Sequence, residues 1–417
     1  MTTPTARLLP LAIIALIGLN LRPFLTGVGP LAGAIDEAMG LGLQGMALLT
    51  LLPMLLMGIG AFAGPLLQQV VPARRLVILA LALLTAGSLL RLFASDGGVL
   101  LGTALLCGLG AAVIQAVLPG MIKRDFPQRV AIVTGLYSAM LMGGGALGAQ
   151  MTPILVQAWG SWQIALAMLA APAVVALALV RRLPPDSASS TTSGTMSLLL
   201  RRPRAWMLMA GFGLVNGGYA SAVAWLAPFY QEHGRSAAAS GSLLAVLAIS
   251  QAAAALLLPI AARGRNDRRG WLWLTLAMQG IGFAGLAFAP QSAPLAIAVL
   301  LGAGLGGCFA LMMIVALDHL PDSAKAGALS ALMQGGGFVI AALAPWIVAM
   351  LHDGAGGFAT GWIVHLACVA VVAGLVANLA PEGYGRAMAT VLGKPSFEGL
   401  IPRTGRRRGA LDDRCGI

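Results

Sequence analysis

The chain has 417 residues, of which 59% are hydrophobic and only 10% are charged. Soluble domains carry about a quarter charged residues and under half apolar ones, so this much apolar surface must meet lipid. The composition therefore excludes a soluble enzyme, a disordered chain and a secreted disulfide scaffold. The four cysteines and four histidines show no pairing or ligand spacing, so we expect no disulfide, metal or other cofactor.

Twelve apolar runs follow one another along the chain, each long enough for a membrane-spanning helix of about 20 residues. In the first half they cover residues 8–35, 46–71, 76–93, 99–122, 130–156 and 162–180. In the second half they cover residues 206–230, 243–262, 271–289, 296–317, 326–351 and 358–380. The runs are continuously apolar rather than alternating, which favours helices over the strands of a membrane barrel.

The basic residues are distributed unequally between the two sides that these runs define. With the N-terminus inside, 23 of the 26 Lys and Arg residues fall on the cytoplasmic side, whereas Arg91 and Arg235 fall on the opposite side. Arg22 remains inside the first run. This positive-inside bias predicts that both termini are cytoplasmic. The net charge of +12 is thus a topology signal close to the lipid bilayer, and we expect no nucleic-acid partner.

The longest central connection divides the chain into two parts. It contains Pro184-Pro185 and a Ser/Thr-rich stretch, a composition typical of a flexible linker. We predict an N-terminal six-helix bundle over residues 1–181 and a cytoplasmic linker over 182–204. A C-terminal six-helix bundle follows over 205–380, and a disordered cytoplasmic tail over 381–417.

The two halves repeat each other in sequence. Asn20 and Asn216 lie 196 residues apart in the opening runs, and the Gly-Leu-Gly triplets at 108–110 and 304–306 have the same offset. Two parallel six-helix repeats with the substrate near the midplane are the architecture of the major facilitator fold. We therefore predict an all-α polytopic membrane protein with twelve transmembrane helices in two pseudo-symmetric six-helix bundles.

Arg22 is the strongest candidate for a functional residue, because it sits in the middle of the first apolar run. A mid-membrane Arg costs about 2.5–3.5 kcal/mol on insertion scales and normally faces a polar partner or cavity. No Asp or Glu lies centrally in any of the twelve runs, which argues against a buried ion pair. Two interpretations stay open: Arg22 binds an anion through its planar fork, or it hydrogen-bonds backbone carbonyls. Pro23 is expected to kink the helix and to free a carbonyl near Leu19.

Few other polar side chains lie inside the runs, and we expect some of them to line the substrate site with Arg22. These candidate substrate-binding residues are Asn20, Gln115, Asn216, Tyr219 and Gln334. The alternative is that the amides only join helices through hydrogen bonds. Asp318 and His319, at the end of the tenth run, are candidate gating residues unless they form an exposed helix cap.

Two Gly-x-Gly-x-x-Gly strings occur, at residues 143–148 and 302–307. A dinucleotide-binding loop would need a preceding strand, and both strings lie inside long apolar runs. We interpret them as surfaces where small residues let two helices pack closely. No Walker-type phosphate-binding pattern is present, so ATP-driven transport is not expected.

Several motifs resemble the cyanate/2-nitroimidazole (CynX/NimT) transporters of the major facilitator superfamily. They are Leu19-Asn20-Leu21-Arg22-Pro23, Ile114-Gln115-Ala116-Val117-Leu118-Pro119, Asn216-Gly217-Gly218-Tyr219-Ala220-Ser221, Ala316-Leu317-Asp318-His319 and Met333-Gln334-Gly335. The resemblance covers nearly all of both bundles and implies transport of cyanate or a similarly small anion across a bacterial inner membrane. An exporter of 2-nitroimidazole-like or other drug-like molecules is the alternative that the sister branch implies.

We expect a secondary active or facilitative transporter that works by alternating access, as a monomer. An anion bound at Arg22 would neutralise the site and ease closure of the two bundles around it. The absence of a carboxylate in the middle of the runs favours uniport or anion exchange over proton symport, with proton coupling through Asp318 or His319 as the alternative. A membrane-embedded enzyme or sensor would need clustered acid/base, nucleophilic or metal-binding groups, which the sequence lacks.

Overall fold

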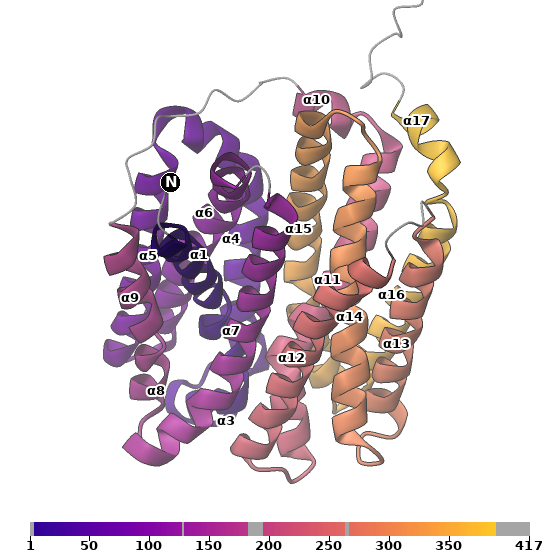
Figure 1. Ribbon diagram of the computed structural model, residues 1–417. Coiled ribbons are helices and arrows are strands. Elements are labelled where there is room, and N and C mark those ends of the chain that lie inside the picture. The colour runs from indigo at the N-terminus through magenta and orange to yellow at the C-terminus, as the bar shows by residue number, and fades with distance from the viewer. Residues whose placement is uncertain (1–3, 127–128, 182–194, 263–266, 389–417) are drawn as a thin grey trace, which may run out of the picture.

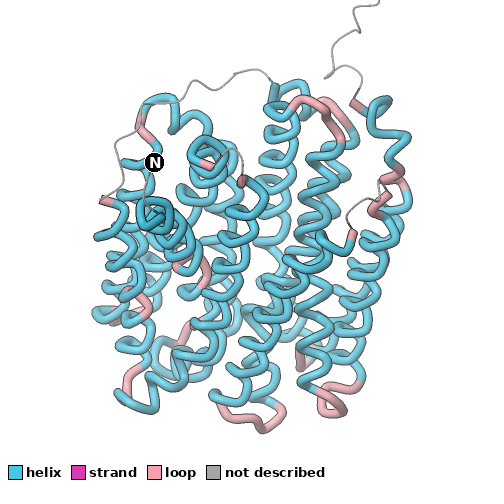
Figure 2. Tube along the Cα trace, in the orientation of Figure 1, coloured by secondary structure: helices cyan, strands magenta, loops and turns pink. Residues whose placement is uncertain are grey.

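The computed structural model describes residues 4–126, 129–181, 195–262 and 267–388, and within these ranges it contains helices and loops but no strand (Figure 2). The helices of the first half are α1 (Pro4–Leu19), α2 (Pro23–Thr26), η1 (Gly29–Leu31), α3 (Ala32–Met39), α4 (Gly42–Val70), α5 (Ala73–Leu90), η2 (Arg91–Phe93), α6 (Gly97–Asp125), α7 (Val130–Trp159), α8 (Trp162–Met168) and α9 (Ala171–Val180). Those of the second half are α10 (Thr195–Leu200), α11 (Pro203–Glu232), α12 (Ala237–Ala261), α13 (Arg269–Phe288), α14 (Pro294–Asp318), α15 (Ser323–Ala355), α16 (Ala359–Ala377), η3 (Pro381–Gly383) and α17 (Tyr384–Ala387).

Twelve segments within the described ranges are long and apolar enough to cross a membrane, and they coincide with the twelve predicted runs. We expected each run to form a single helix, and for two of the runs this expectation is wrong. The first divides into α1, α2, η1 and α3, and the sixth divides into α8 and α9. Pro23 and Pro172 lie in the first turns of α2 and α9. A proline lacks the backbone N–H that would continue the preceding helix but is suited to begin a new one.

The helices form two bundles that stand side by side, α1–α9 and α11–α16 (Figure 1). The same packing partners occur in both: α1 packs on α7 as α11 packs on α15, and α5 packs on α9 as α13 packs on α16. Likewise α4 and α5 flank α6, while α12 and α13 flank α14. The bundles meet through α4 against α15 and α12 against α7. This confirms the predicted pseudo-symmetric pair of six-helix bundles.

Both glycine strings lie on close-packed helix surfaces, as predicted. A Cβ added at Gly144 of α7 would clash with the carbonyl oxygen of Leu19 at the end of α1. In the second half, a Cβ at Gly302 or Gly306 of α14 would clash with the carbonyl oxygens of Leu247 and Gln251 of α12. Glycine is required at these three positions because backbone lies directly against backbone.

The outer helices leave large apolar side chains uncovered. Val174 and Val175 of α9, Leu257 of α12, Phe288 of α13 and Leu295 of α14 are all about half exposed or more. Contiguous apolar surface of this kind is stable against lipid and not against water. The protein is therefore a multi-pass membrane protein, with its polar residues confined to the interior and the helix ends.

Two predictions about the connecting segments need correction. Residues 195–200 of the predicted linker form the helix α10. The first eight residues of the predicted disordered tail are also ordered: η3 and α17 fold back, with Tyr384 and Met388 buried. Residues 182–194 and 389–417, the remainder of those predictions, lie outside the described residues.

Candidate functional site

The candidate site begins at a break in the first membrane span. The helix α1 ends at Leu19 and α2 begins at Pro23, with Arg22 at the N-cap position. Pro23 disfavours the helical conformation for the residue before it, which favours an interruption at this place. The chain breaks completely instead of kinking as expected, with Gly144 and Gly148 of α7 packed against the backbone of Leu19 and Pro23. Asn20 and Leu21 close the end of α1 by donating their backbone N–H groups to Ile17 and Gly18. The break places a cation in the middle of the span.

The guanidinium of Arg22 is buried and incompletely paired. Arg22 is only 4% exposed, and its Nε and Nη1 atoms have no hydrogen-bond partner among the described residues. A buried N–H without an acceptor costs free energy, and a buried cation without a counter-ion costs more. Among the described residues, these two nitrogens thus have neither the carboxylate nor the carbonyl acceptors that a purely structural role would require. An anion that enters the site would supply the missing acceptors.

Tyr219 of α11 brings the second bundle to this cation. The Cζ atom of Arg22 lies 4.9 Å from the centroid of the Tyr219 ring, a cation–π distance. Tyr219 is itself buried. The contact joins α11 to the break in the first span, so it crosses between the two bundles. Of the predicted site residues, the structure brings Arg22 and Tyr219 into direct contact.

Three of the predicted amides each donate to a backbone carbonyl four residues earlier in the chain. Asn20 and Asn216 occupy equivalent places in the two halves, and each donates its Nδ2 to the carbonyl four residues earlier, Leu16 at 2.7 Å and Phe212 at 2.8 Å. One donor of each amide is therefore used locally, and the place of both residues in the substrate site stays a prediction. Gln334 makes a long contact of 3.5 Å with the Ser330 carbonyl, and Gln115 is half-buried on α6.

Tyr137 of α7 is a site residue that the sequence interpretation missed. It is buried, its ring lies against Gly18 of α1, and its phenol interacts electrostatically with the charge of Arg22. A signal for it exists in the sequence. Tyr137, Gly144 and Gly148 lie at i, i+7 and i+11, which puts them on one helix face. That face packs against the broken first span.

The candidate gating residues lie at the linker end, which is the end of the molecule where α9 ends and α10 begins (upper in Figure 1). Asp318 pairs with Arg268 through Oδ2 and Nε at 3.6 Å, and Arg268 also donates to the Ala262 carbonyl. His319 is 2% exposed and stacks on Tyr384 with ring centroids 3.8 Å apart, so it is not the exposed cap that we considered. All these contacts stay within the C-terminal bundle.

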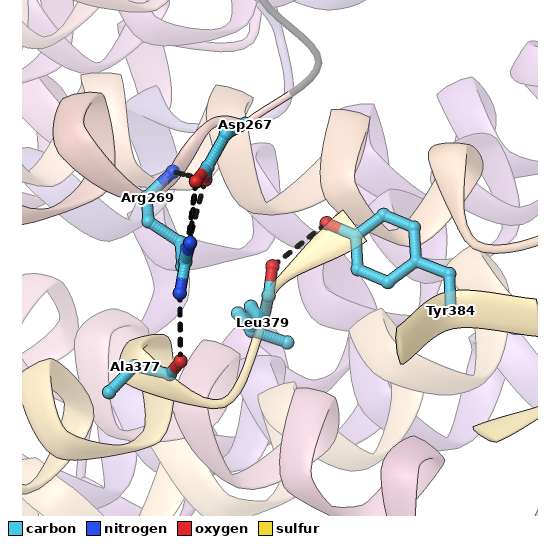
Figure 3. Close-up of polar contacts among 5 residues, drawn as sticks. All are labelled: Asp267, Arg269, Ala377, Leu379 and Tyr384. Carbon is cyan, nitrogen blue, oxygen red and sulfur yellow. Dashed lines mark hydrogen bonds and ion pairs between the residues drawn. The ribbon is translucent and has the colours of Figure 1, made fainter. Parts of the chain in front are cut away.

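Hydrogen bonds from Arg269 and Tyr384 hold the C-terminal end of the last span, α16, also at the linker end. Arg269 binds the carboxylate of Asp267 and donates to the Ala377 carbonyl, while the Tyr384 hydroxyl donates to the Leu379 carbonyl at 3.2 Å (Figure 3). The N-terminal bundle has a counterpart, since Arg74 donates to the carbonyls of Val180 and Arg181 at the end of α9. In both halves an arginine caps the last helix of its bundle.

The opposite end, here called the far end, holds hydrogen bonds between the bundles. Gln231 of α11 donates to the Pro30 carbonyl at 3.0 Å, and Gln44 of α4 donates to Asp353 of α15 at 3.2 Å. A Cβ at Gly29 would lie 2.7 Å from the carbonyl oxygen of Val223, so the two backbones are in contact there. These contacts join the bundles on the far side of Arg22.

His319 provides a prediction about pH. Burial lowers the pKa of His319 from 6.5 to about 4, so the imidazole is neutral near pH 7. The unfolded chain binds the proton more readily between these two values. The stability that depends on this residue is therefore present above pH 6.5 and is lost as the pH falls toward 4, by up to about 3 kcal/mol. Thermal unfolding in detergent should show a smaller acid-induced fall in the midpoint for His319→Gln than for the wild type. Parallel pH curves for the two proteins would contradict this.

No group of three or more His, Cys, Asp or Glu side chains that could hold a metal ion is found among the described residues. The groups that the structure brings together at the site are the buried guanidinium of Arg22 and the phenol rings of Tyr219 and Tyr137.

Sequence comparison identifies related proteins. Residues 10–345 match the family model of the Major Facilitator Superfamily. The cyanate transport protein CynX of Escherichia coli (strain K12) is 47% identical over 373 residues, covering 89% of this chain and 97% of that protein. The 2-nitroimidazole transporter of the same organism is 34% identical over 379 residues, covering 89% of this chain and 94% of that protein.

Solved structures share the fold at much lower identity. A bacterial homologue of the human lysosomal transporter Spinster, in an inward-facing and unoccupied conformation, superposes with a TM-score of 0.73 at 14% identity, covering 95% of this chain and all of that one. A D-xylose–proton symporter gives the same TM-score and identity, covering 90% of this chain and 98% of that one. These likenesses extend over both bundles.

Proposed function

The chain belongs to the Major Facilitator Superfamily, and on that premise we propose that it carries a small anion, cyanate before any other, across the membrane by alternating access. It is a transporter of the CynX family and not an enzyme. The finer assignment to cyanate is supported by a relative of 47% identity that bears that name. The observation that carries the proposal is the buried guanidinium of Arg22 at the contact between the two bundles, two of whose nitrogens have no hydrogen-bond partner among the described residues.

The chemistry of Arg22 favours a small anion. A guanidinium stays charged at physiological pH and presents a planar set of N–H donors. Two of its nitrogens lack acceptors, and the cation lies against the Tyr219 face while Tyr137 is within electrostatic reach. Cyanate is a linear, three-atom anion with acceptor atoms at both ends. Its small size keeps the steric demand on the flanking rings low.

Binding at this place couples to the conformational change. A ligand shifts a conformational equilibrium only through a difference in affinity between the two states. The anion would neutralise Arg22 on the first span, and α11 of the second bundle contributes Tyr219 to the same site. We propose that closure of the bundles is favourable with the anion bound and costly around the bare cation. Uniport or anion exchange follows from this, since no carboxylate partners Arg22 among the described residues.

The orientation is part of the same proposal. We propose cytoplasmic termini in a bacterial inner membrane, which the unequal distribution of Lys and Arg along the sequence supports. We also propose that the chain acts as a monomer. The hydrogen bonds from Gln231 to Pro30 and from Gln44 to Asp353 would then form the periplasmic closure. We propose that Asp318 and His319 act by fixing the end of α14 within its own bundle, through Arg268 and Tyr384.

Reconstitution into liposomes tests the proposal directly. Proteoliposomes loaded with unlabelled cyanate should exchange it for external labelled cyanate in a saturable manner, and protein-free liposomes should not. Unlabelled 2-nitroimidazole, which tests the alternative substrate class, should compete only weakly. Uptake at the protein-free rate, or stronger competition by the neutral nitroaromatic than by cyanate, would reject the anion assignment.

A further inference from the structure

The irregular part of the first span leaves backbone carbonyls that helix hydrogen bonds do not satisfy. Three of them, spaced every third residue, accept from side chains of other elements. Phe24 accepts from Arg91 of η2, Gly27 accepts from Thr152 of α7 at 3.1 Å, and Pro30 accepts from Gln231 of α11 at 3.0 Å. The segment that carries Arg22 is therefore held in place by three side chains from outside it.

Arg91 is the most unusual of the three. The sequence interpretation placed it in a connection on the far side, but it is only 1% exposed. Both of its terminal nitrogens donate to the Phe24 carbonyl, at 3.2 and 3.3 Å. The neighbouring backbone N–H groups of Gly27 and Val28 donate to Pro23 and Leu25, so the guanidinium replaces the donor that a continuous helix would have supplied.

A guanidinium is an expensive way to satisfy one carbonyl. Its Nε atom has no hydrogen-bond partner among the described residues, and removing the charge from water carries a desolvation cost. An apolar side chain of similar volume would fill this place at lower cost, and the carbonyl could be covered by a neutral donor. We take this cost as a reason to ask which geometry Arg91 maintains.

The position of Arg91 connects it to the anion site. The helix α2 has four residues, too few to be stable alone, so its place is set by tertiary contacts. Phe24 lies in α2 two residues after Arg22, and the Arg22 carbonyl accepts the N–H groups of Leu25 and Thr26. Arg22 and Phe24 therefore belong to one rigid turn. A displacement of the Phe24 carbonyl moves the backbone of Arg22 with it.

We infer that Arg91 is a positioning residue for the anion site, which locks α2 and hence Arg22 to the N-terminal bundle. The inference rests on the proposed function. Thr152 holds the next free carbonyl to the same bundle from α7. Gln231 belongs to the other bundle, so its bond to Pro30 must break when the bundles separate at the far end. Arg91 and Thr152 keep the Arg22 geometry while that bond opens and closes.

The test is a comparison of KM and maximal rate for cyanate exchange in Arg91→Met, Arg91→Lys and Thr152→Val. Arg91→Met should raise KM by about 10-fold, with the maximal rate per folded protein within about 3-fold of wild type, because the anion meets a misplaced but still present Arg22. Arg91→Lys, which retains the charge and one donor, should recover part of the affinity. Thr152→Val should raise KM by a smaller factor.

Arg235→Met is the matched control. Arg235 also lies at the far end, where its guanidinium stacks on Tyr230 of its own bundle, 5.6 Å from the ring centroid. Its loss removes a cation from the same side and should leave KM for cyanate unchanged. The control separates positioning of Arg22 from a general effect of positive charge on the local anion concentration.

A wild-type KM in Arg91→Met, with activity reduced only in proportion to the folded protein, would overturn the inference. If that variant does not fold, a wild-type KM in both Arg91→Lys and Thr152→Val overturns it equally. Failure of the proposed function is distinguishable, because the wild type would then show no saturable cyanate exchange at all.

Discussion

Replacing Arg22 with Gln is expected to abolish saturable cyanate exchange, with a loss of at least about 100-fold in uptake at low substrate. A charge-assisted contact to a desolvated anion contributes about 3 kcal/mol, which corresponds to that factor. Arg22→Lys keeps the charge but loses the planar fork and its position over the Tyr219 ring. It should retain a measurable fraction of activity with a raised KM. Uptake of labelled cyanate into proteoliposomes measures the rate and the KM of both variants.

Tyr219 offers a matched pair of controls for the Arg22 variants. Tyr219→Phe keeps the ring face that lies 4.9 Å from the guanidinium and should remain close to wild type. Tyr219→Leu removes the ring and should weaken transport, since the cation then loses its contact with the second bundle. Wild-type uptake in both Arg22 variants would defeat the assignment of Arg22 as the anion site.

Gly144→Ala is expected to be the most damaging of the conservative substitutions. The new Cβ would clash with the Leu19 carbonyl oxygen, which is backbone and cannot rotate away. Overpacking of this kind costs about 1–3 kcal/mol of stability, and here it also pushes α1 and the Arg22 break away from α7. We expect a lower midpoint of thermal unfolding together with a fall of about 10-fold or more in cyanate uptake.

The neighbouring glycine supplies the control. Gly143 lies on the same helix, and a Cβ added there meets nothing within 4 Å. Gly143→Ala should be neutral or slightly stabilising, because Ala is favoured over Gly in a helix by up to about 1 kcal/mol. Equal effects of the two substitutions would show that the contact between α7 and the first span does not position the site.

The architecture was predictable because its signals are local or repetitive. Twelve runs of sufficient length predict twelve spans. The offset of 196 residues, which the pair Asn20 and Asn216 shares with the two Gly-Leu-Gly triplets, predicts equivalent places in two bundles. The form of the break at Arg22 was not predictable from Pro23 alone. A kink and a complete break differ by tertiary contacts, here the approach of Gly144 and Gly148 to the backbone of Leu19 and Pro23.

The site residues also divide into those that a local sequence signal reveals and those that depend on tertiary contacts. Arg22 stands out in the sequence because a central cation in an apolar run has few structural uses. Arg91 does not stand out, since it follows the third run where a loop arginine is ordinary, and its acceptor is 67 residues away in the chain. The amides of Asn20 and Asn216 were chosen for being polar, yet each satisfies a carbonyl of its own helix.

Equilibrium binding of labelled cyanate to the purified protein in detergent separates recognition from the transport cycle. The wild type should bind one cyanate per chain saturably, and folded Arg22→Gln should show no saturable binding over the same concentrations. Equal affinity in the two proteins would contradict the account, since the anion would then be held without Arg22, the buried cation that contacts Tyr219 of the second bundle.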